Sequence, residues 1–286
     1  MVIKRIFSNF AGEFNVLKIV YVFIVHRIYL FILVVLLACL GCEWRLRPSE
    51  EQQSETALEI DRYDQLERLY LTTGDFAALQ QMNTQYPTET RMLIEDVLQL
   101  GPANDPEMKS KLLLFFQDST LQMLINDVEH EFANLSDVES TLAESFLRLS
   151  RMIPGLEMPQ VYAQISSLDQ SIVAGDGYLG ISLDKYLGSE YPLYLKYGYS
   201  DRQRSMMKRS FIVPDCIGFY LLSLYPLPEG DTTRAALDRH MGKIQYVVNQ
   251  SMGIRQFDNV HVKRAEQFMK KNKGISVEKF LQLSYY

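Results

Sequence analysis

An uncharged apolar stretch near the N-terminus places the strongest constraint on what this chain can become. Residues 28–41, fourteen in all, contain no charged side chain, and the basic flank His26-Arg27 precedes them. As a helix this stretch would span about 21 Å, which is shorter than the roughly 30 Å hydrocarbon core of a membrane. A short apolar run behind a basic flank is instead typical of a secretory signal peptide. We therefore predict that residues 1–38 are a signal segment that does not belong to the folded protein.

Two cysteines lie at the end of this stretch. Leu36-Leu37-Ala38 runs directly into Cys39, and this order of apolar residues, a small residue and a cysteine resembles a bacterial lipobox. Leu40-Gly41-Cys42 is a second candidate, which is weaker because Cys39 stands where Leu or Val is usual. We predict that one of the two, with Cys39 preferred to Cys42, carries acyl chains such as palmitate and anchors the chain to a membrane.

Two other interpretations of the N-terminus stay open. A transmembrane anchor would form if residues 19–25 joined the apolar run, but Arg27 would then lie in mid-bilayer at a cost of about 2.5–3.5 kcal/mol. Alternatively, cleavage of a plain signal peptide would release a soluble protein. Residues 39–56 are rich in Glu, Gln and Ser and contain Pro48, so they bury little and indicate a flexible tether.

Charge and cysteine content exclude several classes of protein. The formal net charge is −6, and 25 basic and 34 acidic residues remain once residues 1–38 are removed. Such a chain is not expected to bind nucleic acid, which requires clustered Lys and Arg, or to find a membrane by overall attraction to anionic lipid. The three cysteines exclude a disulfide scaffold and a Cys-based zinc site. We expect Cys216 to be a buried apolar residue.

The remaining residues, 57–286, are predicted to form a single α+β domain that is predominantly helical. Apolar residues recur at helical spacing from residue 57 to about residue 154. Residues 161–165 and 171–174 are rich in β-branched and aromatic side chains, and Gly175-Asp176-Gly177 predicts a turn into a further strand at 178–183. Together these segments predict a small central antiparallel sheet of three or four strands. Further helices are predicted at 201–209, 214–224, 232–252, 258–272 and 277–283.

A search for catalytic motifs finds none. Glu129-His130 begins like a zinc-binding helix, but Asn134 occupies the position where a second histidine is needed. His240 and His261 have no neighbouring ligand pattern, and we expect both to be exposed. The chain also lacks a phosphate loop, a Gly-x-Ser-x-Gly elbow and a dinucleotide fingerprint. The sequence therefore does not support an enzyme, and we expect neither a metal nor a cofactor.

The densest group of distinctive residues lies between residues 176 and 199. Three glycines fall within residues 176–188, together with Asp184 and Tyr186, and a run of tyrosines that includes Tyr191 and Tyr194 follows. One interpretation is a loop that tyrosine rings pack onto the sheet. The other is a binding surface for a protein or ligand, since tyrosine is favoured at interfaces.

Several of these strings resemble the GldB family of gliding-motility lipoproteins. Its central motif is similar to residues 181–188, read as Ile-Ser-Leu-Asp-Lys-Tyr-Leu-Gly, followed by Tyr191-Pro192 and Ile212-Val213-Pro214-Asp215. Its Gly-Lys-x-x-Tyr segment and its opening motif are similar to residues 242–246 and 60–64. The resemblance extends from about Leu58 to Asn249. It implies a bacterial envelope lipoprotein with no established catalytic activity. The candidate binding surface that we predict from the residues themselves consists of Asp184, Tyr186, Tyr191, Tyr194 and Asp215.

The family is also distantly similar to zinc metallopeptidase-like domains, in which a sheet precedes a helix bearing His-Glu-x-x-His. The corresponding helix here, residues 213–220, contains no histidine. The resemblance thus implies a degenerate zincin-like fold without its metal, a pseudo-peptidase at most. We expect a non-catalytic, lipid-anchored, periplasm-facing protein that binds envelope proteins of gliding-motility or secretion machinery. The alternative is an envelope hydrolase, directed at peptides or peptidoglycan, whose site these motifs do not reveal.

Overall fold

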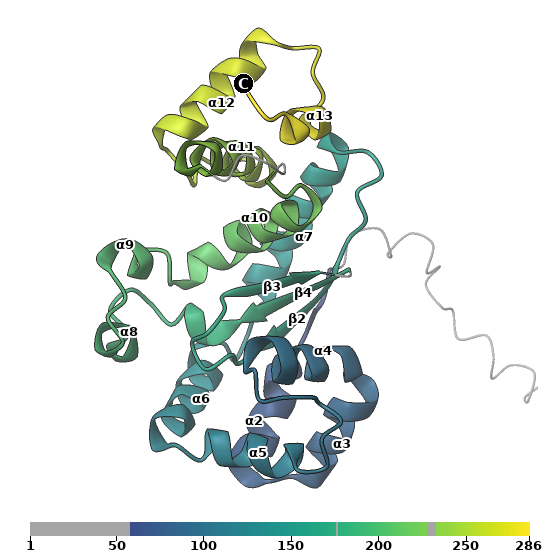
Figure 1. Cartoon of the computed structure of the whole chain (residues 1–286), viewed down its shortest axis with the longest axis vertical. Coiled ribbons are helices and arrows are strands. Elements are labelled where there is room, and N and C mark those ends of the chain that lie inside the picture. The colour runs from purple at the N-terminus through teal and green to yellow at the C-terminus, as the bar shows by residue number, and fades with distance from the viewer. Residues whose placement is uncertain (1–57, 176, 228–232) are drawn as a thin grey trace, which may run out of the picture. The chain divides into compact units, whose positions relative to one another are not determined.

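A small sheet lies between two groups of helices in the computed structural model, which describes residues 58–175, 177–227 and 233–286 (Figure 1). These residues fall within one unit, Thr56–Tyr286. The predictions for the signal segment, the tether, Cys39, Cys42 and Asp176 lie outside the described residues. Within the described part of the chain, no helix is both long and apolar enough to cross a membrane.

The sheet of the described residues has four strands in the order β1-β2-β4-β3. They are β1 (Ile60–Asp61), β2 (Gln160–Gln164), β3 (Ile172–Gly175) and β4 (Tyr178–Ser182). β2 pairs in parallel with both β1 and β4, and β3 alone is antiparallel to its neighbour β4. The predicted α+β class is confirmed, but the predicted antiparallel sheet is wrong, because the β3–β4 hairpin leaves β4 parallel to β2. Periodicity reports which face of a strand is buried and carries no information on strand direction.

The helices before the sheet confirm the helical prediction for residues 57–154. Asp75 and Asp118 begin two of them by accepting hydrogen bonds from backbone N–H groups of the first turn. The elements are α2 (Tyr63–Thr73), α3 (Phe76–Gln85), α4 (Pro87–Met92), a π-helical turn (Leu93–Val97), α5 (Met108–Phe116), α6 (Ser119–Glu131) and α7 (Ser136–Met152). α2 packs against β2, and its buried Tyr63 ring lies 6.2 Å from the Tyr162 ring.

The helices after the sheet were also largely predicted, except for one. They are α8 (Pro192–Lys196), α9 (Asp201–Arg204), α10 (Ile212–Leu224), α11 (Arg234–Met252), α12 (Val260–Lys271) and α13 (Val277–Gln282). α8 lies in the tyrosine-rich run, where no helix was predicted. α10 packs against β3, β4 and α7, while α12 and α13 pack on α11 (Figure 1). Cys216 of α10 is buried, as predicted.

Two polar residues of α11, Lys243 and His240, are buried. Lys243 donates hydrogen bonds to the carbonyl oxygens of Leu281 (2.7 Å) and Leu283 (2.5 Å), which closes the C-terminal end of α13. Burial lowers its pKa to about 8. His240 is buried as well, with Nε2 2.9 Å from the Tyr225 carbonyl oxygen, and burial lowers its pKa. The expectation that His240 is exposed was wrong, because the C-terminal end of α10 contacts it from a separate part of the chain.

Gly242 allows α11 and α12 to approach each other closely. A Cβ atom added at this position would lie 2.5 Å from His261 Cβ and 2.8 Å from the His261 carbonyl carbon. Close approach also leaves His261 half-buried and not exposed, contrary to expectation. In the next turn, the Tyr246 ring packs edge-on against Phe280 of α13. The Gly-Lys-x-x-Tyr segment therefore has a structural role, which is to hold α12 and α13 on α11.

Replacing Gly242 by alanine is expected to lower the free energy of unfolding by about 1–3 kcal/mol, because the new methyl group overlaps the His261 backbone. Gly218→Ala in α10 is the matched control, since the nearest atom to its added Cβ is Val248 Cγ2 at 3.9 Å. Helix propensity alone favours that substitution by up to about 1 kcal/mol. Urea unfolding followed by circular dichroism measures both variants, and an equal loss in the two would contradict the proposed close approach.

Candidate functional site

A buried carboxylate, that of Asp184, organises the region between β2 and α8. Asp184 lies in the short 3₁₀ turn Leu183–Lys185 directly after β4, and its side chain is fully buried. Oδ1 accepts a hydrogen bond from the Ser166 N–H (2.8 Å), and Oδ2 accepts from the Leu168 N–H (2.5 Å) and the Ser166 hydroxyl (3.1 Å). Burial raises the pKa of Asp184, and these hydrogen bonds act in the opposite direction. The carboxylate thus caps a neighbouring loop and not its own helical turn.

The loop that receives Asp184 has an unusual backbone. Ser167 and Leu168 have φ angles of 56° and 64°, in the left-handed region that costs a non-glycine residue about 1–2 kcal/mol. The bend turns successive N–H groups toward acceptors: Ile165 N–H donates to the buried Glu67 (2.8 Å), while those of Ser166 and Leu168 donate to Asp184. Burial raises the pKa of Glu67 well above its usual value. Two buried carboxyl groups therefore hold N–H groups of the strained loop.

Lys185 holds the same loop from its carbonyl side. Its Nζ donates to the Leu168 carbonyl oxygen (3.1 Å) and to the Tyr199 hydroxyl (2.9 Å), and it lies 4.6 Å from the centre of the Tyr199 ring. The Tyr199 hydroxyl donates in turn to the Leu168 carbonyl (2.9 Å). The adjacent residues Asp184 and Lys185 thus bind N–H and C=O groups of one loop.

Tyr194 of α8 and Tyr191, directly before this helix, pack beneath the turn. Tyr194 is fully buried, and its hydroxyl donates to the Asp184 carbonyl oxygen (2.6 Å) while it accepts from the Leu187 N–H (3.0 Å). Tyr191 is half-buried and donates to Asp127 Oδ2 of α6 (2.7 Å). The two rings lie 5.1 Å apart in an edge-on arrangement. These contacts fit the interpretation of a loop packed onto the sheet by tyrosine rings.

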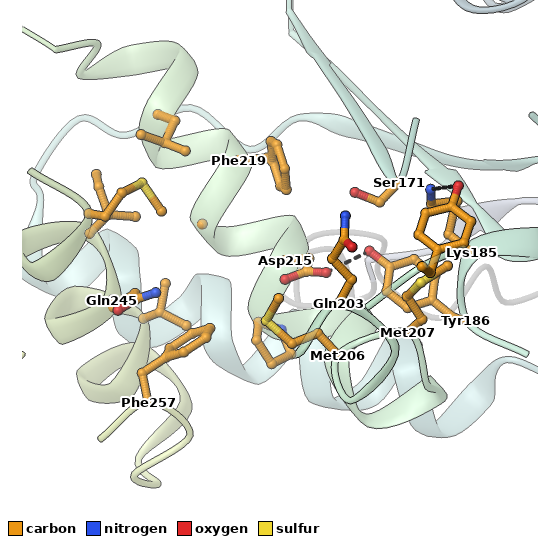
Figure 2. Close-up of a pocket in the computed structure, with 17 residues that line it drawn as sticks. Ser171, Lys185, Tyr186, Gln203, Met206, Met207, Asp215, Phe219, Gln245 and Phe257 are labelled. Atoms are coloured by element: carbon orange, nitrogen blue, oxygen red, sulfur yellow. Dashed lines mark hydrogen bonds between the residues drawn. The ribbon is translucent and has the colours of Figure 1, made fainter. Parts of the chain in front are cut away.

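Tyr186 and Asp215 form a polar pair at the edge of a cavity (Figure 2). The buried Tyr186 hydroxyl donates to Asp215 Oδ2 at 2.9 Å, and Asp215 lies in the first turn of α10. Tyr186 is the one hydrogen-bond partner of this carboxyl among the described residues. The protein around Asp215 raises its pKa to about 7 by desolvation, although the bond from Tyr186 acts to lower it. The side chain can therefore be neutral or charged near neutral pH.

The cavity beside this pair has a volume of about 330 Å³ and is mainly apolar. Its walls come from the α9–α10 connection, α10, α11 and the segment before α12 (Figure 2). The apolar part of the lining includes Met206, Met207, Phe219, Leu222, Met241, Ile244, Val248 and Phe257, and the polar part includes Ser171, Lys185, Gln203 and Gln245. The arrangement can take up an apolar group and present it with the Asp215 carboxyl.

The structure brings two of the five candidate residues, Tyr186 and Asp215, together at the cavity. Asp184 and Tyr194 are buried behind its wall, and Tyr191 contacts α6. The apolar lining was missed, because ordinary apolar residues on four separate segments carry no common sequence signal. In the described part of the chain, no three His, Cys, Asp or Glu side chains are placed to hold a metal ion.

Replacing Asp184 by asparagine is expected to lower the free energy of unfolding by about 1.5–3 kcal/mol, because the amide cannot accept all three hydrogen bonds. Asp201→Asn serves as the control, since its side chain is 96% exposed and its ion pair with Arg204 is superficial. Chemical denaturation of both variants measures the difference. Equal stabilities would show that the loop does not depend on Asp184.

The raised pKa of Asp215 predicts a pH dependence of stability. Between its ordinary pKa of 3.8 and about 7, the folded protein holds a proton that the unfolded chain has released. This contribution to stability is complete below the lower value and is lost as the pH rises through about 7. Asp215→Asn removes it, so unfolding midpoints of wild type and variant should diverge across this range, with the wild type losing stability relative to the variant as pH rises. Parallel curves would contradict the raised pKa.

The family model described as "Gliding motility protein GldB" matches residues 44–259. This span includes the sheet, the Asp184 loop, the cavity wall and α11, and it ends before α12. No curated protein and no solved structure matches the chain. The likeness to zinc metallopeptidase-like domains therefore stays a prediction.

Proposed function

The chain belongs to the GldB family of gliding-motility lipoproteins, and on this basis we propose that it is a non-catalytic, lipid-anchored component of the cell envelope. Its role is to bind a partner protein of gliding-motility or secretion machinery. Family membership supports the association with the envelope and with gliding motility. The lipid anchor, the periplasmic orientation and the identity of the partner as a protein are proposed in addition to what family membership supports.

The proposed anchor is the acylated Cys39, with Cys42 as the alternative. Residues 43–57 separate these cysteines from the first described residue. An extended segment of this length reaches about 50 Å, which allows the folded residues to stand away from the bilayer or to lie on it.

Intact-mass spectrometry of the membrane-extracted protein tests this anchor. The expected mature chain begins at Cys39 and carries acyl mass, which Cys39→Ala abolishes and Cys42→Ala leaves in place. The reverse pattern would assign the anchor to Cys42. An unacylated protein in the soluble fraction from the wild-type gene would contradict the lipoprotein proposal.

The observation that carries the binding role is the apolar cavity with the Asp215 carboxyl on its wall. Three methionines, Met206, Met207 and Met241, line it, and their flexible, polarisable side chains adapt to varied apolar partners. About 330 Å³ lies at the small end of ligand pockets, so the cavity suits one or two side chains and not a large molecule. We propose that it receives an apolar segment of a partner protein that offers Asp215 an N–H or O–H donor.

An envelope hydrolase is the second candidate function, and one observation favours it. A carboxyl with a pKa of about 7 is suited to general acid–base catalysis. Hydrolysis also needs an activated nucleophile or a second acid–base group. The Ser171 hydroxyl interacts with Tyr186, whose pKa burial raises well above its usual value, so Tyr186 is poorly suited to act as the base. The geometry therefore supports binding better than turnover.

Occluding the cavity tests the binding role. A photo-cross-linkable phenylalanine analogue in place of Met206, which is 38% exposed at the rim, is expected to capture an envelope protein in cells. Gly218→Leu projects a side chain into the cavity and should reduce this product about tenfold, equivalent to about 1.4 kcal/mol, whereas Gly218→Ala should leave it unchanged.

The same cross-linker at Leu114, which is 69% exposed on α5 and distant from the cavity lining, should not give this product. An equal yield with Gly218→Leu would contradict the proposed site. Hydrolysis of peptide or peptidoglycan by the wild type, lost in a folded Asp215→Asn variant, would support the hydrolase instead.

A further inference from the structure

Charge is strongly segregated along the chain. Residues 57–254 contain 16 basic and 27 acidic residues, whereas residues 255–286 contain seven basic and three acidic ones. The C-terminal helices of an otherwise acidic protein are therefore positively charged. They also lie beyond the segment that matches the GldB family, so the proposed function above does not account for this charge.

Most of this positive charge lies on the outward face of α12. Lys263, Arg264, Lys270 and Lys271 are all exposed, and their spacing of one, seven and eight residues places them on one side of the helix with Gln267. Val262 and Ala265 on the opposite side are buried against α11. We call the exposed side the basic face of α12; no acidic residue belongs to it.

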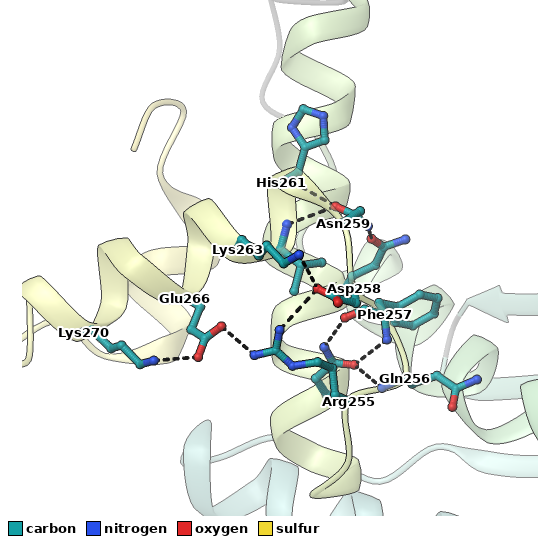
Figure 3. A network of polar contacts seen from close by, with 12 residues as sticks. Arg255, Gln256, Phe257, Asp258, Asn259, His261, Lys263, Glu266 and Lys270 are labelled. Carbon is teal, nitrogen blue, oxygen red and sulfur yellow. Dashed lines mark hydrogen bonds and ion pairs between the residues drawn. The ribbon is translucent and has the colours of Figure 1, made fainter.

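The carboxylates near the basic face are already paired with cations (Figure 3). Asp258 contacts Arg255 (3.2 Å) and Lys263 (3.1 Å), and Glu266 contacts Arg255 (2.9 Å) and Lys270 (2.7 Å). Two carboxylates thus serve three cations. Arg264, Lys271 and Lys273 form no ion pair with any described residue. On this face, Arg264 and Lys271 are consequently left for a partner outside the chain.

We infer that the basic face of α12 docks on the anionic phosphate headgroups of the membrane that carries the lipid anchor. The inference rests on the proposed anchor, which would keep α12 near a lipid surface. Clusters of four or more Lys and Arg side chains are typical of segments that bind anionic lipid. The acidic remainder of the protein is repelled by the same surface, so the two effects favour one orientation, with α12 toward the membrane.

Two features favour a lipid surface over an acidic protein. Four of the five cations on or next to the face are lysines, which are depleted at protein interfaces but attract phosphates well as point charges. Val260, at the N-terminal end of the same face, is 54% exposed and suits shallow insertion among headgroups. Overall attraction to anionic lipid stays unfavourable for the whole acidic chain, so α12 orients a protein that the anchor has already placed.

The test uses the full-length acylated protein in vesicles, with an environment-sensitive fluorophore on Gln267→Cys. The N-terminal cysteine that is not acylated is replaced by serine, and Cys216 is buried and does not interfere. We expect a blue shift in vesicles that contain phosphatidylglycerol and none in pure phosphatidylcholine. The same fluorophore on Gln81→Cys, which is exposed on α3, should not respond. Inorganic phosphate added to neutral vesicles should also give no shift.

Removing cations from the basic face of α12 should weaken the blue shift in proportion to the number removed. Arg264→Gln with Lys271→Gln is expected to weaken the affinity of the basic face for phosphatidylglycerol vesicles by about fivefold per cation, which is seen as a higher phosphatidylglycerol content at half of the shift. Lys109→Gln with Lys111→Gln, on α5, is the matched control and should leave it unchanged. Vesicle co-flotation is measured in parallel, because loss of flotation on neutral vesicles reports failure of the anchor alone.

The absence of a shift at residue 267 in phosphatidylglycerol vesicles, with or without flotation, would overturn the inference. The same conclusion would follow if the α5 control weakened the response equally. A shift produced by soluble polyglutamate but not by phosphatidylglycerol vesicles would replace the lipid surface with an acidic protein partner.

Discussion

The candidate site depends on the capture of a strained loop by the buried carboxylate of Asp184. The chain leaves β2 through two left-handed residues, Ser167 and Leu168, a conformation that costs free energy unless its N–H groups are bound. Asp184 accepts hydrogen bonds from the N–H groups of Ser166 and Leu168, and Glu67 accepts one from the N–H group of Ile165. Because Asp184 directly follows β4, these bonds also join the ends of two neighbouring parallel strands.

The position of the cavity wall follows from this capture. Because Asp184 is fixed, its neighbour Lys185 lies where it can donate a hydrogen bond to the loop. Tyr186 in turn lies next to the first turn of α10, where its hydroxyl donates to Asp215. The polar atoms of the string from Ser182 to Leu187 are thus largely occupied within the protein. What faces the cavity is an apolar lining with one half-buried carboxyl, which is the chemistry of recognition more than of turnover.

The spacing of apolar residues predicted where helices and strands lie. It could not predict features that depend on contacts between distant parts of the chain. Helical spacing located the helices from α2 to α7 and from α10 to α13, and β-branched residues located three strands. The two residues of β1 are too few to show a period, and the direction of β4 depends on the order of pairing in the sheet. The burial of His240 results from chain segments that pack on it from a distance. Asp184 and Asp215 were singled out as candidates, but their different roles required the fold.

Amide hydrogen exchange in the native protein tests the central claim most directly. Ile165, Ser166 and Leu168 lie at or beyond the end of β2, where amides of an ordinary loop exchange by local fluctuation. If Glu67 and Asp184 hold this loop as described, these three amides should exchange only through global unfolding, with the same free energy as the core of β2 and β4. Fast exchange at Ser166 and Leu168 alongside a protected β2 would show that the Asp184 carboxylate does not hold the loop, and with it the cavity wall, in place.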